Sequence, residues 1–262
     1  MRKMARALNG RSNLYNAAAR AKARKASLID TTRMRQLVQQ GTESIGASIG
    51  EMGYRTEMDI YGSRMSGADA IEAALFHNLD NDLAGVLKFC QGHLKSLVAI
   101  YVERFDYEKA KTVLRAINGG ASDEIIETQI LPSENPRNAP WLNIVRNTEG
   151  LQEAVEAMSG TSWGMTLSKL DADATLEDME NALDLQYFAD ALKAGRGREG
   201  GPRLRRYLRM EIDHRNVINE FRAIRMEMTP EKRQSMVIPG GKIDAGTMRQ
   251  ALSLIHISAP TS

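Results

Sequence analysis

The sequence predicts an all-α protein that consists of two similar helical domains in tandem, followed by the start of a third. Three observations lead to this prediction. Apolar residues recur with helical spacing, as at Ala110, Val113, Leu114 and Ile117. Prolines avoid these periodic segments and lie between them. One phrase also occurs twice along the chain, which indicates an internal duplication.

The helices and their boundaries follow from local signals. The periodic segment that includes 110–117 is expected to end at Gly119-Gly120, a typical helix stop. Another helix is predicted where Leu, Met and Leu recur at 176, 179 and 183. The proline-rich stretch 131–140 is a predicted joint, and the glycine-rich stretch 195–202 is a predicted flexible loop. The glycines of 43–53 indicate helix packing or a bend, since no Lys-Ser/Thr pair follows them as in a phosphate loop.

Composition restricts the class of protein. A chain of 262 residues that is 42% hydrophobic can bury one large core or two modest ones. Its 35 basic and 33 acidic residues give a net charge of +2, which does not require a nucleic-acid partner. The single Cys90 cannot form an intramolecular disulfide, and no apolar run reaches the roughly 18 residues of a membrane span. We therefore expect cytosolic residence, with any membrane contact made through partners or a surface.

The duplicated phrase reads YVERFDYEKAKTVLRAI at 101–117 and YLRMEIDHRNVINEFRAI at 207–224. A constant offset also aligns a later proline in each copy, so the register is kept across the intervening loop. The predicted domains are 1–120, with a basic N-terminal helix, and 121–236, with a third repeat starting at 237–252 and a non-native tail at 253–262. The repeat anchors, interpreted as structural or interface residues, are Asp106 with Asp213, Leu114 with Phe221, Arg115 with Arg222, and Pro132 with Pro239.

The acidic and basic anchors have different expected roles. Asp106 and Asp213 are predicted to be helix N-caps, because a carboxylate there accepts hydrogen bonds from free amides at the positive end of the helix dipole. Each arginine follows its aspartate by nine residues, which places the two on opposite helix faces. Neither arginine is therefore expected to pair with its own aspartate, which leaves Arg115 and Arg222 available to pair with another helix, another domain or another protein, and the residues alone do not choose among these.

The sequence contains no recognisable catalytic, cofactor or metal motif. Its histidines share no close spacing, and no HExxH, CxxC, nucleophile elbow or Walker-type loop is present. His77 near Asp80 and Asp82 is better explained as part of a solvated helix face than as a metal cluster. We accordingly expect a protein without catalytic residues, bound cofactor or metal, and a small-molecule enzyme has the least support.

Two basic segments leave an alternative function open. The first comprises Arg2, Lys3, Arg6, Arg11, Arg20, Lys22, Arg24 and Lys25, and the second comprises Arg196, Arg198, Arg203, Arg205, Arg206 and Arg209. The first segment could contact RNA, anionic lipid or an acidic protein surface. Its composition also resembles that of an organellar presequence. The remaining alternative is a solvated helix face. A basic, all-helical nucleic-acid-binding protein is therefore the alternative, although aromatic residues make up only 5% of the chain.

Several phrases together resemble a known family. These are LYNAAARAKARKASLI at 14–29, MGYRTEMD at 52–59, the two copies of the Asp-to-Arg-Ala-Ile phrase, and the ILP and IPGGKI turns. In this order and spacing, over residues 12–252, the chain resembles the C subunit of archaeal A-type (V/A-type) ATP synthases, a relative of the d subunit of V-ATPases.

The resemblance implies a funnel of three similar all-α domains without catalytic residues. Such a protein belongs to the central stalk of the rotor and links the D and F subunits of the central shaft to the membrane ring of proteolipid subunits. Ion flow then drives ATP synthesis, or hydrolysis drives ion pumping. The implied location is peripheral, at the cytoplasmic face of the membrane, and no nucleic-acid partner is expected. Because the third repeat stops soon after it starts and 253–262 is unlike the family, we expect a C-terminal truncation.

Overall fold

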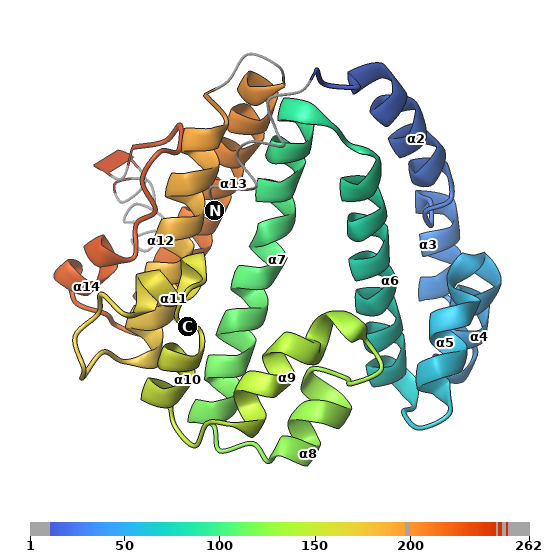
Figure 1. The fold of residues 1–262 in the computed structure, drawn as a ribbon, viewed down its shortest axis with the longest axis horizontal. Coiled ribbons are helices and arrows are strands. Elements are labelled where there is room, and N and C mark those ends of the chain that lie inside the picture. Colours follow the sequence, from blue (N-terminus) through green and yellow to red (C-terminus); the bar gives the residue numbers. More distant parts are fainter. Residues whose placement is uncertain (1–10, 197–199, 245, 248–249, 251–262) are drawn as a thin grey trace, which may run out of the picture. The chain divides into compact units, whose positions relative to one another are not determined.

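The structure, a computed structural model, describes residues 11–196, 200–244, 246–247 and 250. Every regular element in these residues is helical, which confirms the predicted all-α class (Figure 1). The order begins with α2 (Leu14–Ala26), α3 (Thr31–Val38), α4 (Thr42–Ile49), η1 (Gly50–Tyr54), α5 (Arg55–Gly62), α6 (Gly67–Phe89) and α7 (Gly92–Asn118). It continues with α8 (Asp123–Ile125), η2 (Ile126–Ile130), η3 (Pro136–Asn138), α9 (Ala139–Arg146), α10 (Leu151–Ala157), α11 (Ser162–Leu167), α12 (Leu176–Ala194), α13 (Gly201–Arg225) and α14 (Pro230–Ser235).

The chain divides into two compact units. Unit 1 consists of Met1–Val102 and Thr112–Ala157, and unit 2 consists of Glu103–Lys111 and Met158–Ser262. Helix α7 thus contributes residues to both units. The division differs from the predicted boundary between 120 and 121. The two units are defined by which residues pack together, whereas the predicted domains were defined by the repeat in the sequence. The tandem domains, with the third repeat and the funnel shape, therefore stay predictions.

In unit 1, α5 packs against α6 through small and aromatic side chains. Tyr61 is fully buried against Ala70, Ala73 and Ala74, whose small side chains permit close helix approach. Its hydroxyl lies 3.1 Å from Nδ1 of His77, and burial raises the pKa of Tyr61 to about 12. The tyrosine therefore stays neutral at physiological pH.

The predicted solvated face around His77 is wrong. His77 is buried, and the buried carboxylate of Asp80 accepts a hydrogen bond of 2.7 Å from Nδ2 of Asn135. The sequence shows these residues on one helix, but the aromatic ring and the amide that cover them come from other segments of unit 1. His77 and Asp80 are accordingly part of a polar core contact.

Part of the first basic segment is used in packing within unit 1. The guanidinium groups of Arg20 and Arg24 lie 4.9 and 5.9 Å from the centre of the Phe89 ring, which is a cation–π arrangement. Arg24 also forms an ion pair with Asp82. These contacts give α2 a structural role in place of a purely solvated basic face. Several predicted features lie outside the described residues, namely Arg2, Lys3, Arg6, Arg198 and the tail at 253–262.

The predicted joints coincide with helix boundaries. Helix α7 ends at Asn118, with Gly119 as its C-cap. The bend expected in 43–53 is confirmed, since α4 continues into the π-helical η1 and the backbone leaves helical geometry at Gly53 before α5. The segment 131–140 separates η2 from the body of α9, as predicted.

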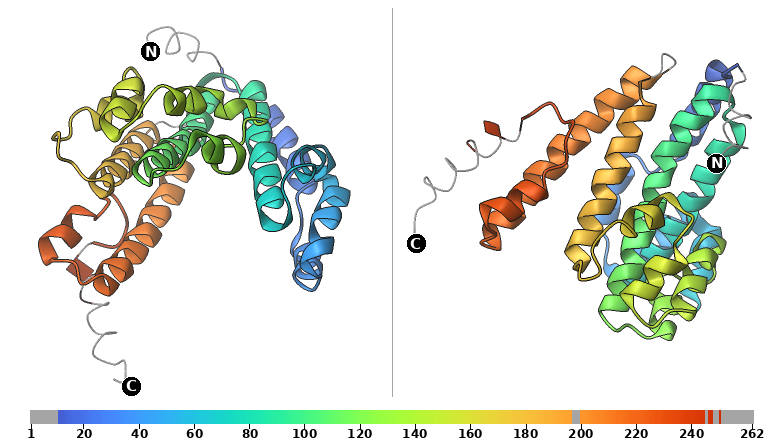
Figure 2. Two further views of the ribbon diagram at one scale, coloured as in Figure 1. Left: turned by 90° about the horizontal axis from the view of Figure 1, so that it is seen from below. Right: turned by 60° about the vertical axis from the view of Figure 1, so that its left-hand side comes forward.

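In unit 2, α12 and α13 run side by side in opposite directions (Figures 1 and 2). Helix α12 begins with a capping box in which the side chains of Thr175 and Asp178 each accept from the other's backbone amide. Leu183, Phe188 and Ile212 are fully buried in the core of this unit. The predicted loop at 195–202 is shorter than expected, because residues 201 and 202 already form the first turn of α13.

Candidate functional site

The two anchor aspartates are not helix caps, so that prediction is wrong. Helix α7 begins at Gly92 and α13 begins at Gly201, which places Asp106 and Asp213 inside their helices. The residues that precede each aspartate belong to the same helix. Treating Asp as a local start signal failed because the helices extend several turns further towards the N-terminus than the repeated phrase suggests.

Asp213 instead helps to hold the turn that follows α14. Its Oδ1 accepts hydrogen bonds from the backbone amides of Lys242 and Ile243, at 2.8 and 3.0 Å. One turn before it, Arg209 donates from Nη2 to the carbonyl of Gly241 at 2.9 Å. Helical spacing puts these side chains on one face, where they bind backbone groups of the IPGGKI segment.

Asn216 completes this arrangement at its buried end. Its Nδ2 donates to the carbonyl of Ile238, and its Oδ1 accepts from the Ile238 amide, both at 2.8 Å. Both residues are buried, so the amide side chain replaces the water that these backbone groups would otherwise bind. We refer to Arg209, Asp213 and Asn216 as the α13 cradle.

The glycines of IPGGKI fit the cradle for steric reasons. Gly240 has a φ of +100°, in the region that favours glycine. A Cβ on Gly241 would lie 2.1 Å from Oδ1 of Asp213, well inside contact distance. The backbone can approach the Asp213 carboxylate only because this position has no side chain. Pro239, the anchor just before them, is exposed.

The first copy of the repeat shows matching local features. Ser122 caps α8 by accepting from the Ile125 amide, and Thr229 caps α14 by accepting from the Lys232 amide, at the same offset as the anchors. Leu131 is buried, like its counterpart Ile238. Both copies thus place a long helix, a capped short helix and a buried apolar residue in the same order.

The anchor pairs differ in exposure. Leu114 is fully buried, whereas Phe221, its counterpart, keeps 46% of its surface exposed. Pro132 is buried, whereas Pro239 is exposed, and both Arg115 and Arg222 are exposed. The equivalent positions of the two copies therefore do not have equivalent surroundings.

Replacing Asp213 by alanine is expected to lower the free energy of unfolding by about 1 to 2 kcal/mol, because two backbone amides lose a charged acceptor. Arg222→Ala, at an exposed position further along the same helix, should change it by less than about 0.5 kcal/mol. Urea unfolding of the two variants tests this. Equal losses would mean that Arg222 has an intramolecular partner, and no loss in Asp213→Ala would contradict the role of the cradle.

A cluster of charged side chains joins α7, α12 and α13 within unit 2. Nζ of Lys111 lies 2.9 Å from Oδ1 of Asp184 and 3.1 Å from Oε2 of Glu108. Arg215 binds the same two carboxylates, with both distances at 3.2 Å. Arg104 lies 2.6 Å from Oε1 of Glu211. The members of this charge cluster are Arg104, Glu108, Lys111, Asp184, Glu211 and Arg215.

The cluster is partly withdrawn from water. The Lys111 side chain is only 4% exposed. Burial alone would raise the pKa of Glu108, but the ammonium of Lys111 and the guanidinium of Arg215 outweigh it, so the pKa of Glu108 falls below its ordinary value. Arg215 also lies 5.3 Å from the centre of the Phe188 ring. Cations and anions alternate, so each charge has an opposite partner.

Sequence reasoning missed the charge cluster, although the repeat register carries a signal for it. Arg104 corresponds to Glu211, and Glu108 corresponds to Arg215, at the anchor offset. The charge is reversed between the copies, and in both cases the two corresponding residues pair with each other. A search for charge reversal at equivalent positions would have found both pairs.

A second charged contact holds α14 against α12. Nζ of Lys232 lies 2.8 Å from Oδ1 of Asp178 and 3.5 Å from Oε2 of Glu177. The hydrogen bond from Lys232, together with those from Thr175, lowers the pKa of Asp178 to about 2. Asp178 thus caps the N-terminus of α12 and also holds α14 in place through Lys232.

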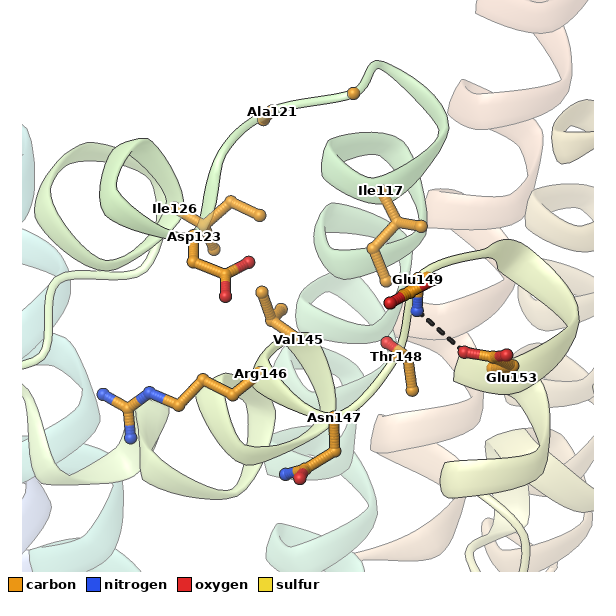
Figure 3. Close-up of a pocket in the computed structure, with 11 residues that line it drawn as sticks. Ile117, Ala121, Asp123, Ile126, Val145, Arg146, Asn147, Thr148, Glu149 and Glu153 are labelled. Atoms are coloured by element: carbon orange, nitrogen blue, oxygen red, sulfur yellow. Dashed lines mark hydrogen bonds between the residues drawn. The ribbon is translucent and has the colours of Figure 1, made fainter.

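A pocket of about 760 Å³ lies in unit 1 near the C-terminal end of α7 (Figure 3). Asp123, Glu149 and Glu153 contribute acidic side chains to its lining, and Glu153 accepts a hydrogen bond of 2.8 Å from the Glu149 amide. Arg146, the cation of the lining, is paired with Glu127. In the part of the chain that the structure describes, no group of three potential ligand side chains is placed to hold a metal ion.

The sequence matches the ATP synthase (C/AC39) subunit family over residues 17–257. The chain belongs to this family. It is 33% identical over 217 residues to the C subunit of the A-type ATP synthase of Haloquadratum walsbyi, covering 80% of this chain and 62% of that protein. The corresponding subunit of Haloferax volcanii is 31% identical over 220 residues, covering 82% of this chain and 63% of that protein.

A third relative extends the match. The C subunit of the A-type ATP synthase of Methanosarcina mazei is 31% identical over 244 residues, which is 92% of this chain and 67% of that protein. The chain spans somewhat under two thirds of the length of the first two relatives. The comparisons favour an ATP synthase subunit over the nucleic-acid-binding alternative.

Membership of the C/AC39 family makes this chain a relative of subunits of a membrane-associated complex. Among the described residues, none of the helices is both long and apolar enough to span a bilayer.

Proposed function

We propose that the chain acts as a non-catalytic central-stalk subunit of an A/V-type ATP synthase. In this role it links a central shaft made of the D and F subunits to the membrane rotor ring of proteolipid subunits, so that ion flow drives ATP synthesis or hydrolysis drives ion pumping. It is peripheral, at the cytoplasmic face of the membrane. The observation that carries the proposal is the family match over residues 17–257.

The charge cluster supports a mechanical role. A part that transmits torque must keep its helices from sliding along one another. In unit 2, ion pairs join α7 to α12 and α13 at fixed positions, and the cluster has members on all three helices. A shift of one helical turn, about 5.4 Å, would separate the pairs that join different helices beyond hydrogen-bonding distance. The pairs between helices therefore oppose axial displacement of one helix along another.

Co-purification tests the proposal. The affinity-tagged chain is mixed separately with a purified D–F complex and with detergent-solubilised rotor ring from a related A-type enzyme, and then with both together. We expect retention of each partner, and simultaneous retention of both when all are present. As a control for binding that depends only on the basic charge of the chain, the tagged chain is also mixed with double-stranded DNA and with RNA. Retention of neither protein partner, or retention of nucleic acid alone, would overturn the proposal.

A further inference from the structure

Two ion pairs in unit 2 join residues of α7 to their own counterparts in the repeat. Arg104 pairs with Glu211 at 2.6 Å, and Glu108 pairs with Arg215 at 3.2 Å. In both pairs the two positions are separated by the offset of the repeat anchors. A step of four residues along α7 matches a step of four along α13, so the two helices run in the same direction and in register at this contact. We call Arg104–Glu211 and Glu108–Arg215 the register pairs.

An in-register contact between two copies of one helix places each residue opposite its counterpart. If the copies carried the same charged residues, like charges would face each other at both levels, which is unfavourable. The sequence instead has Arg followed by Glu on α7, at 104 and 108, and Glu followed by Arg on α13, at 211 and 215. The reversal therefore places opposite charges together at both levels.

The same order of charges opposes a slipped register. If α13 moved by one turn in one direction, Arg215 would lie opposite Arg104. Movement by one turn in the other direction would place Glu211 opposite Glu108. Either slip loses both pairs and brings two like charges together. Neighbouring helices can shift by one turn, about 5.4 Å, between alternative packings, so these two slips are the relevant competitors of the native alignment.

Burial makes this penalty effective. The Glu211 side chain is 10% exposed and the Arg104 side chain is 24% exposed, so solvent screens their charges only in part. Lys111, the remaining α7 member of the charge cluster, corresponds to the uncharged Ile218. Within the charge cluster, discrimination between alignments of α7 on α13 therefore rests on the two register pairs.

We propose that the register pairs are a conformational device that selects one alignment of α7 on α13 and rejects the one-turn slips on either side. The pairs do more than hold two helices together, because a slip replaces attraction by repulsion. An apolar contact at these positions would hold the helices without distinguishing the three alignments by charge. This inference does not rest on the proposed function, since it concerns unit 2 of the chain alone.

A double-mutant cycle in the full chain tests the pairing. Arg104→Glu and Glu211→Arg, made singly, each place like charges opposite one another, and each should raise the unfolding equilibrium constant at least about tenfold. The two changes together restore an opposite pair. The unfolding constant of the double variant should therefore be at least about tenfold lower than the product of the single effects predicts. Urea unfolding followed by circular dichroism gives these constants.

Neighbours on the same helix do not affect the outcome of the cycle. Arg104→Glu places a glutamate one turn before Glu108, and Glu211→Arg places an arginine one turn before Arg215. Each change is present in a single variant and in the double variant, so these effects cancel. The matched control combines Lys95→Glu with Glu211→Arg. Lys95 is exposed and precedes residue 104 by about 13 Å along α7, so the two effects should simply multiply.

A distance measurement reports the alignment itself. Spin labels are attached to cysteines that replace Lys109 of α7 and Arg222 of α13, both in unit 2, and the buried Cys90 is replaced by alanine. Electron paramagnetic resonance then gives the distance between the two labels. The chain with its register pairs intact should give a single distance.

Reversal of one charge should populate the slipped alignment. In Glu211→Arg, movement of α13 by one turn brings residue 211 opposite Glu108, which removes the clash with Arg104 and forms an opposite pair. Residue 222 then lies one turn further from residue 109 along the helix axes, so a second, longer distance should appear. Adding Arg104→Glu should restore the single distance.

Two results would overturn the proposal. The first is a cycle without coupling, in which the effects of Arg104→Glu and Glu211→Arg simply multiply. The second is an unchanged single label distance in folded Glu211→Arg, which would make the pairs ordinary stabilising contacts without a role in alignment. If Glu211→Arg does not fold, rescue of folding by Arg104→Glu supports the proposal, and absence of rescue contradicts it.

Discussion

Replacing Lys111 by alanine is expected to lower the free energy of unfolding by about 3 kcal/mol. The ammonium is almost fully buried and lies within 3.1 Å of carboxylate oxygens of both Glu108 and Asp184. After its removal Arg215 still binds both carboxylates, but they lose their more deeply buried cation. Urea unfolding followed by circular dichroism measures the loss.

The size of this effect comes from the carboxylates that remain. Removing one partner of a buried ion pair costs more than the pair itself contributes, because the remaining charges stay partly desolvated and keep only part of their compensation, here from Arg215. The matched control is Lys95→Ala, an exposed lysine of the same helix, which should change stability by less than about 0.5 kcal/mol. If both variants lose the same amount, the charge cluster contributes no more than an ordinary surface lysine.

The pH dependence of stability should follow from the same residues. Burial opposes ionisation of Glu108, but Lys111 and Arg215 lower its pKa on balance, so its contribution to stability is fully present above the pKa of the unfolded chain. This contribution is lost as the pH falls through the lower, folded-state pKa. Lys111→Ala should therefore flatten the decline of stability with acidification. An unchanged slope would mean that other carboxylates dominate acid unfolding.

Asn216→Ala should lower the free energy of unfolding by about 2 to 3 kcal/mol. The side chain satisfies both the amide and the carbonyl of the buried Ile238. Alanine removes both hydrogen bonds and offers no replacement. Two buried backbone groups without partners cost more than the bonds themselves contribute.

Hydrogen exchange gives a local test of the Asn216 prediction. The Ile238 amide should exchange much faster in Asn216→Ala, whereas amides in the centre of α12 should change only with the global loss of stability. The control is Asn219→Ala, a partly exposed position one turn along α13, which should lose less than about 1 kcal/mol. Unaltered protection of Ile238 would contradict the role of the cradle.

Local signals in the sequence predicted the secondary structure well where they act over a few residues. The helical class, the stop at Gly119 and the bend among the glycines of 43–53 all depend on neighbouring residues, and the structure confirms them. The N-cap prediction for Asp106 and Asp213 also used only neighbouring residues, and it failed. An aspartate inside a helix carries no local mark that distinguishes it from one at the start.

The candidate sites depended on residues that are far apart in sequence. His77 was expected on a solvated helix face, but Tyr61 lies against it and Asn135 binds the neighbouring Asp80. Asp213 accepts from backbone amides that follow it by 29 and 30 residues, beyond the reach of any periodicity argument. The duplicated phrase correctly drew attention to α7 and α13, yet their pairing residues were not among the anchors.

Short segments of the sequence were sufficient to establish that this protein is helical and resembles the C/AC39 family, because periodicity, helix stops and ordered phrases are local properties. The roles of the repeated helices depend instead on tertiary packing. On α7 the helix face that includes Tyr107 is covered, and on α13 the corresponding face that ends at Phe221 is exposed. Burial depends on which distant helix packs against a face, and two copies of one phrase can meet different neighbours.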